Sequence, residues 1–167
     1  GENAVHVLGS ANFTTAGNGL TQAGMNFPRG VAFDATNSRL FVADYNNNRV
    51  LVFDTAAITN GENAVRVLGQ ADFTSNTAAT TQARMRGPAG ASFDAVNNRL
   101  FVADSDNRRV LVFDTATITD GENAANVLGQ ADFTTNTGSV GQARMSHAYG
   151  VAFDATNNRL FVADTRN

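Results

Sequence analysis

Short apolar runs alternate with polar turns along the whole chain. Residues 30–34 read Gly-Val-Ala-Phe-Asp, residues 40–43 read Leu-Phe-Val-Ala, and residues 49–54 read Arg-Val-Leu-Val-Phe-Asp. Asp, Asn and Ser residues separate these runs, and no run has the length or the spacing of an amphipathic helix. The pattern predicts short antiparallel strands joined by tight polar turns.

The same pattern returns every 60 residues without an insertion. Gly-Glu-Asn-Ala begins at Gly1, Gly61 and Gly121, and Arg-Leu-Phe-Val-Ala-Asp occurs at 39–44, 99–104 and 159–164. A fixed period in this range is typical of tandem structural repeats. We therefore divide the chain into repeat units 1–60, 61–120 and 121–167. The third unit lacks its copy of the Arg-Val-Leu-Val-Phe-Asp run.

A fourth strand is predicted near the beginning of each unit, where residues 5–9, 65–69 and 125–129 alternate in polarity. Four antiparallel strands per unit, in tandem and without helices, favour all-β propeller blades. A β-solenoid is the alternative, although its rungs are usually shorter. We expect about three blades, with the Gly-Val-Ala-Phe-Asp strand innermost and the Val-Leu-Gly strand on the outer edge.

Large apolar residues of the strands are expected to fill the core between neighbouring blades. This predicted core contains Phe33, Leu40, Phe41, Val50, Val52, Phe53, Val7 and Leu8, together with their equivalents 60 residues further along.

These motifs resemble a known family. Pro-x-Gly-Val-Ala-Phe-Asp, Arg-Leu-Phe-Val-Ala-Asp and Asn-x-Arg-Val-Leu-Val-Phe-Asp resemble the NHL repeat, and Val-Leu-Gly-Gln-Ala-Asp-Phe is similar to bacterial NHL-type proteins in particular. The resemblance covers essentially the whole chain and implies a β-propeller, commonly of six blades. The chain departs from the family in its long Gly-Glu-Asn to Met-x-x-Pro segment and in Ala148, which replaces a proline.

Two complete units and most of a third cannot close such a ring. We therefore expect either a fragment of a longer parent chain or a subunit that self-associates through open blade edges, because unpaired strands invite pairing.

Composition narrows the possible partners. The net charge is -3, the sequence has no cysteine, and all twelve Lys and Arg positions are Arg. The acidic balance without a basic run argues against nucleic acid, although animal NHL-type propellers include RNA binders. Without cysteine, disulfides and thiolate metal sites are excluded. No stretch has the length of a membrane span. The Lys-free, Asn- and Thr-rich surface leads us to expect an extracellular or cell-surface location.

Asp and Arg residues that recur in every unit are expected to have structural roles. Asp44-x-Asn46-x-Asn48 and Asp104-x-Asp106 resemble a calcium loop, but they lack its central Gly and distal Glu. Asp and Asn side chains also accept backbone hydrogen bonds in tight turns, which is the favoured interpretation. We predict no metal and no other cofactor. The predicted structural positions are Asp34, Asp94, Asp154, Arg39, Arg99, Arg159, Asp44, Asp104 and Asp164.

Positions that differ between units are candidates for ligand binding. The loop before the innermost strand reads Asn-Phe-Pro-Arg, Arg-Gly-Pro-Ala and Ser-His-Ala-Tyr in the three units, and the turn after the second strand also varies. Both connections emerge on one face of an up-and-down blade, and exposed loops on rigid scaffolds often carry binding residues. Neutral drift is the alternative explanation. The candidate rim residues are Arg29, Tyr45, Arg86, Asp106, His147, Tyr149 and Arg166.

The sequence predicts no catalytic residues. Its two histidines, His6 and His147, occupy different positions of the repeat, and no Gly-x-Ser-x-Gly motif is present. We therefore expect a non-catalytic module that binds protein or glycan. The alternative is a piece of a propeller enzyme, such as a metal-dependent lyase or hydrolase, whose catalytic residues lie in other blades.

Overall fold

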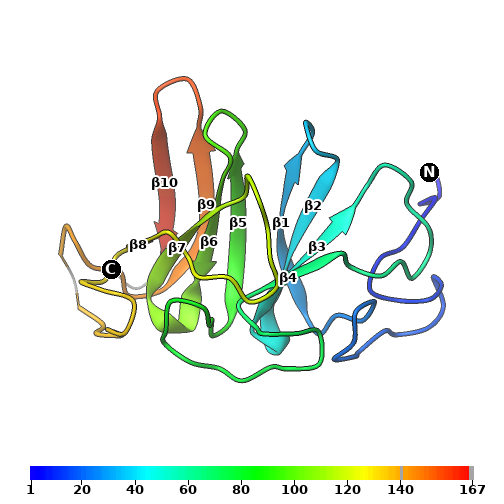
Figure 1. Cartoon of the computed structure of the whole chain (residues 1–167), viewed down its shortest axis with the longest axis horizontal. Coiled ribbons are helices and arrows are strands. Elements are labelled where there is room, and N and C mark those ends of the chain that lie inside the picture. Colours follow the sequence, from blue (N-terminus) through cyan, green and yellow to red (C-terminus); the bar gives the residue numbers. More distant parts are fainter. Residues whose placement is uncertain (140, 166–167) are drawn as a thin grey trace.

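The computed structural model describes residues 1–139 and 141–165, which form three antiparallel sheets (Figure 1). The first sheet contains β1 (Pro28–Asp34), β2 (Arg39–Asp44), β3 (Arg49–Asp54) and β4 (Arg66–Leu68), in that order. The second sheet repeats it with β5 (Pro88–Asp94), β6 (Arg99–Asp104), β7 (Arg109–Asp114) and β8 (Asn126–Leu128). The third contains β9 (Ala148–Asp154) and β10 (Arg159–Asp164).

The all-β prediction is therefore confirmed, and the chain is part of a propeller. We refer to the three sheets as blades 1, 2 and 3.

Blades and sequence units are out of phase by one strand. The outermost strand β4 pairs with β3, with Leu51 opposite Val67, so blade 1 crosses the boundary between the first two units. Residues 5–9 were predicted to form a strand, and this prediction is wrong. Among the described residues no β3-type strand pairs with them, and Gly9 makes an isolated bridge with Gly24.

Aspartates fix both turns of blades 1 and 2. Asp34 accepts the backbone N–H groups of Thr36 and Asn37 and pairs with Arg39 at 2.6 Å. The second turn is a short 3-10 helix, η1 (Tyr45–Asn47) in blade 1 and η2 (Ser105–Asn107) in blade 2. Asp44 Oδ1 accepts the N–H of Asn26. Its Oδ2 accepts hydrogen bonds from the side chains of Asn47 and Arg49. In this structure both oxygens of Asp44 bind protein donors at the turn.

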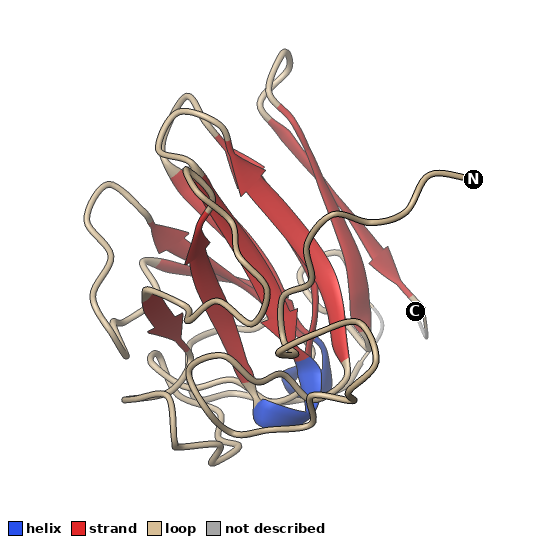
Figure 2. Ribbon diagram, turned by 90° about the vertical axis from the view of Figure 1, so that its right-hand side faces the viewer, coloured by secondary structure: helices blue, strands red, loops and turns tan. Residues whose placement is uncertain are grey.

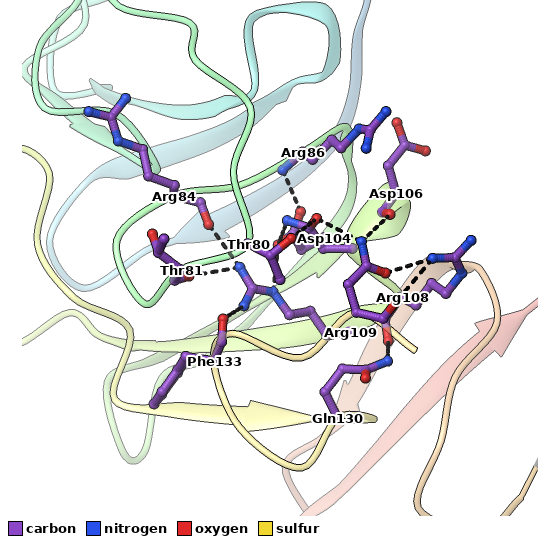
Figure 3. A network of polar contacts seen from close by, with 12 residues as sticks. Thr80, Thr81, Arg84, Arg86, Asp104, Asp106, Arg108, Arg109, Gln130 and Phe133 are labelled. Atoms are coloured by element: carbon purple, nitrogen blue, oxygen red, sulfur yellow. Dashed lines mark hydrogen bonds and ion pairs between the residues drawn. The ribbon is translucent and has the colours of Figure 1, made fainter. Parts of the chain in front are cut away.

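A buried arginine attaches each long connection to its blade. Figure 3 shows Arg109, which has no exposed surface, with Nε 2.7 Å from Asp104 Oδ2. Its other nitrogens donate to the backbone carbonyls of Thr81, Arg84 and Phe133. Arg49 makes the equivalent bonds in blade 1. The long segment that departs from the family pattern is thus held by this recurring arginine.

The inner strands β1, β5 and β9 lie next to one another where the blades meet (Figure 1). Glycine is required at this junction, because a Cβ on Gly30 would lie 2.6 Å from the carbonyl oxygen of Ala89. Further out, Phe41 of blade 1 stacks on Phe93 of blade 2, with ring centroids 5.7 Å apart. Blades 2 and 3 repeat the contact through Phe101 and Phe153 at 5.1 Å.

The two outer faces of the three-blade unit expose the unpaired members of this contact. Phe33 occupies the repeat position of Phe93 and is 56% exposed, whereas Phe161 occupies the position of Phe41 and is 58% exposed. The predictions that Phe33 and Phe161, the equivalent of Phe41, belong to the core are therefore wrong, because no described blade packs against either of these faces. On the outer face of blade 1, Leu8 and Met25 cover another part of the sheet.

Candidate functional site

The variable connections meet at one end of the strands. The 3-10 helices η1 and η2 lie side by side at that end (Figure 2). Backbone hydrogen bonds join them to the loops before β1 and β5, from Asn46 N to Asn26 O at 3.1 Å and from Asp106 N to Arg86 O at 3.2 Å. We call this surface the rim, and it comprises residues 26–29, 45–48, 86–89, 105–108 and 146–149.

Arg29 lies among three aromatic rings at the centre of the rim. Its Cζ is 3.6 Å from the ring centroid of Tyr45, 5.1 Å from that of Phe27 and 5.3 Å from that of Tyr149. Tyr149 belongs to blade 3, so this contact spans the inner end of blade 2. Stacking of a guanidinium on aromatic faces is favourable by about 0.5–2 kcal/mol per contact, depending on desolvation.

Asp106 links the same aromatic group to blade 2. The Tyr45 hydroxyl is 3.3 Å and 3.4 Å from the two Asp106 carboxylate oxygens. The Nε2 of His147 is 3.9 Å from Asp106 Oδ1, and the His147 ring stacks on Tyr149 with centroids 6.0 Å apart. Burial, followed by the Asp106 charge, raises the pKa of the Tyr45 hydroxyl despite the opposing charge of Arg29. Tyr45 is therefore a neutral hydrogen-bond donor at physiological pH.

Gly87 and Phe27 complete the rim, and sequence reasoning did not single them out. A Cβ on Gly87 would lie 2.7 Å from Asp106 Oδ2 and 2.9 Å from Tyr45 Cε2, so glycine allows these two residues to meet. Phe27 holds the same repeat position and the same left-handed backbone, with φ 58°. One repeat position holds Phe27, Gly87 and His147 in the three units. Its variation among otherwise similar loops is the signal that could have identified Phe27 and Gly87 from the sequence.

The structure brings most of the predicted rim residues together. Arg29, Tyr45, Asp106, His147 and Tyr149 form one continuous group through the contacts above. Arg86 also lies on the rim, where its backbone N–H donates to Asp104 Oδ1 at 2.7 Å (Figure 3) and its side chain is exposed. Arg166 lies outside the described residues.

Chemically, the rim combines aromatic surface, guanidinium groups and one carboxylate on an exposed surface, an arrangement suited to noncovalent recognition. Within residues 1–139 and 141–165, no three His, Asp or Glu side chains are grouped so as to hold a metal ion. In the same part of the chain, no helix is both long enough and apolar enough to span a membrane.

Comparison with protein families supports the assignment of the blades. The family model described as NHL repeat matches residues 25–53, which include the loop before β1 and strands β1 to β3. This match confirms the resemblance to the NHL repeat. No curated protein matches the chain.

Solved structures share the fold at low sequence identity. A chain of the nidogen/laminin complex is 18% identical with a TM-score of 0.58, and the match covers 86% of this chain and 42% of that one. Luciferin-regenerating enzyme is 15% identical with a TM-score of 0.51, over 86% of this chain and 39% of that one. The Cps50 (Swd1) β-propeller domain of Myceliophteria thermophila is 12% identical with a TM-score of 0.51, over 85% and 34%.

The chain spans less than half the length of each of these structures. Because the fold occurs both in a protein complex and in an enzyme, it does not decide the function of this chain.

Proposed function

We propose that these NHL-type blades form a non-catalytic binding module whose rim recognises a protein partner. The observation that carries this proposal is the convergence of residues that differ between the repeats. Five of these residues come from loops of all three blades and contact one another in one group, namely Arg29, Tyr45, Asp106, His147 and Tyr149. Arg and Tyr are also among the residue types that dominate protein–protein interfaces.

Positions that are identical in the repeat units have a different role from these variable positions. Four aspartates at such positions each bind an arginine and neighbouring turn residues, namely Asp34, Asp94, Asp44 and Asp104. Residues shared by the units thus support the blades, whereas residues unique to one unit gather at the rim. A glycan is the alternative ligand, and a propeller enzyme with its catalytic residues in other blades is the alternative function.

A selection experiment tests the rim. The immobilised chain is presented with a phage library of random 12-residue peptides and, separately, with an array of neutral and acidic oligosaccharides. We expect enriched peptides whose binding is lost in the double variant Phe27→Ser/Tyr149→Ser and retained in Val96→Ser, which removes an exposed apolar side chain from the turn between β5 and β6. Rim-dependent binding of oligosaccharides alone contradicts the choice of a protein partner. Absence of any rim-dependent binding contradicts the proposal.

We also propose that the chain associates with a second copy of itself through its open ends. Strand β10 pairs only with β9 in the described structure, so its other edge is open. Beside it, Gly150, Ala152, Phe161 and Ala163 line a shallow groove. The equivalents of Phe161 in blades 1 and 2 stack on a phenylalanine of the next blade, and Phe33 is the unpaired residue of that type. The two open faces are therefore complementary in a head-to-tail arrangement.

Light scattering after size exclusion tests this association. We expect the unchanged chain to form a discrete dimer. Phe33→Asp and Phe161→Asp should each weaken it, and Val96→Asp should not. A mixture of the two Phe variants keeps one intact pair of faces, so it should recover a dimer that neither variant forms alone. A monomer at all concentrations contradicts self-association. Equal association of all variants contradicts the head-to-tail faces.

A further inference from the structure

We infer that Arg29 is a receptor for a carboxylate group in an acidic segment of the partner that binds the rim. This inference rests on the proposed binding function and specifies the chemistry that the rim recognises.

The guanidinium of Arg29 is positioned by aromatic rings rather than by an acid. Its Cζ lies 3.6 Å from the Tyr45 ring centroid, a distance suited to stacking of a guanidinium on an aromatic face, and such stacking leaves the N–H donors at the edge of the group accessible. Within the described part of the chain, these donors reach no acceptor. By contrast, Arg39, Arg49, Arg99 and Arg109 each pair with an aspartate. Arg29 therefore offers an oriented and unused set of donors on an exposed surface.

A carboxylate is the chemical group that fits these donors. Two parallel N–H groups of a guanidinium match the two oxygens of a carboxylate, which gives a strong and directional charge-assisted contact. The surrounding rings restrict the Arg29 side chain before binding, which reduces the entropy lost on association. Asp106 does not take this role, because it lies at the hydroxyl end of Tyr45, whereas Arg29 stacks on the ring. The exposed Arg86 adds positive charge to the same rim.

Phe27 provides a second indication of an outside contact. Its side chain is 60% exposed, and its backbone is left-handed at φ 58°. A non-glycine residue in this conformation costs about 1–2 kcal/mol, and Gly87 holds the same repeat position without that cost. The Phe27 ring contacts Tyr45 and Arg29, but more than half of the side chain stays exposed, so the strained position points to a function. Together with Tyr149, which is 37% exposed, it suits an apolar or aromatic residue next to the acidic one.

The phage selection described above tests this inference when Arg29→Gln is compared with the unchanged chain. Arg66→Gln is the matched control, because Arg66 is exposed and lies on β4, away from the rim. Peptides enriched on the unchanged chain are sequenced, synthesised, and remade with Asn or Gln in place of each Asp or Glu. We expect an acidic residue adjacent to an apolar or aromatic residue. The affinity of such a peptide should fall about tenfold or more when Arg29 is replaced by Gln or when the acidic residue of the peptide is made neutral. Both changes together should lower the affinity little further than either one alone.

The outcomes separate the two proposals. Peptides that need Phe27 and Tyr149 but contain no required acid, or that bind Arg29→Gln unchanged, overturn the carboxylate receptor while the rim remains a binding site. Selection of acidic peptides that are insensitive to Phe27 and Tyr149 also overturns it, because the charge alone then attracts them. Failure to enrich any rim-dependent peptide overturns both the inference and the proposed protein-binding function. An acidic oligosaccharide lost with Arg29→Gln assigns the carboxylate to a glycan and overturns the acidic protein segment.

Discussion

Arg109 and Asp104 form an ion pair in which neither side chain has exposed surface, with Nε 2.7 Å from Oδ2. The pair joins two neighbouring strands, and the other nitrogens of Arg109 bind carbonyls of two long connections. Blade and connections therefore depend on a single buried cation.

Replacement of this cation should be strongly destabilising. Arg109→Met leaves the Asp104 carboxylate buried without its counter-charge and leaves three carbonyls without their donors, so we expect a loss of about 3–5 kcal/mol in the free energy of unfolding. Arg99→Met is the control, since Arg99 pairs with Asp94 but is 33% exposed, and its loss should be about 1 kcal/mol or less. Urea denaturation followed by circular dichroism measures both. Equal losses contradict the role of burial.

The aromatic contact between blades gives a second matched pair. Phe41 has no exposed surface and stacks on Phe93, so Phe41→Ala should cost about 3–5 kcal/mol through lost burial and a cavity. Phe161 holds the same repeat position at 58% exposure, so Phe161→Ala should change stability by about 0.5 kcal/mol or less. Both are measured by denaturation at a protein concentration low enough to keep the chain monomeric. A large effect of Phe161→Ala under those conditions means that its face is covered within the monomer.

Much of the blade could be predicted from the sequence, because strand alternation and a strict 60-residue period are local signals. The prediction failed where a strand needs a distant partner. Residues 5–9 and 65–69 carry almost the same sequence, but in the described part of the chain a β3-type strand pairs with the second set and not with the first. The prediction that Phe33 is buried failed for the same reason, since the burial of this side chain depends on a neighbouring blade rather than on the local sequence.

The candidate rim was partly predictable for a different reason. Variation between otherwise similar loops identified Arg29, Tyr45 and Tyr149 without any knowledge of distance. The roles of Phe27 and Gly87 depend on a left-handed backbone and on the approach of Asp106, which arise only when three blades are placed together. Periodicity carries no information about such contacts between blades.

Acid should weaken the turns that Asp34 and Asp94 close. Burial opposes the ionised form of each carboxyl, but hydrogen bonds from Asn37 and Arg39, or from Asn97 and Arg99, outweigh it, so the pKa of each group lies below its usual value. Because the pKa in the folded state is lower than in the unfolded state, the stabilisation is present above about pH 4 and is lost as the pH falls below that value.

The measurement is the free energy of unfolding between pH 2 and pH 7, obtained from urea titrations. We expect a decline below about pH 4 that is shallower in Asp34→Asn, which cannot gain a proton on unfolding. Glu2→Gln is the control, because it also removes one negative charge but lies in the exposed N-terminal segment. An unchanged acid slope in Asp34→Asn means that this turn does not contribute to the pH dependence.

The rim can be examined through its own spectroscopic signal, since the chain has two tyrosines and no tryptophan. Both tyrosines, Tyr45 and Tyr149, lie on the rim, so tyrosine fluorescence reports on this surface alone. Gly87→Ala introduces a Cβ 2.7 Å from Asp106 and 2.9 Å from Tyr45 at a left-handed position. We expect it to cost about 1–3 kcal/mol and to change the tyrosine emission of the folded protein, because Tyr45 must move away from the Asp106 carboxylate.

Gly121→Ala separates the change at the rim from a general loss of stability. Gly121 is also left-handed, with φ +69°, and a Cβ there would lie 2.9 Å from the Cα of Ala71 in a connecting segment away from the rim. This variant should lose a similar amount of stability while the emission of its folded state stays unchanged. If both variants alter the emission equally, the tyrosines respond to loosening of the whole chain. If neither alters it, Tyr45 does not depend on the space that Gly87 leaves, and the contact between blades 1 and 2 at the rim is weaker than its geometry indicates.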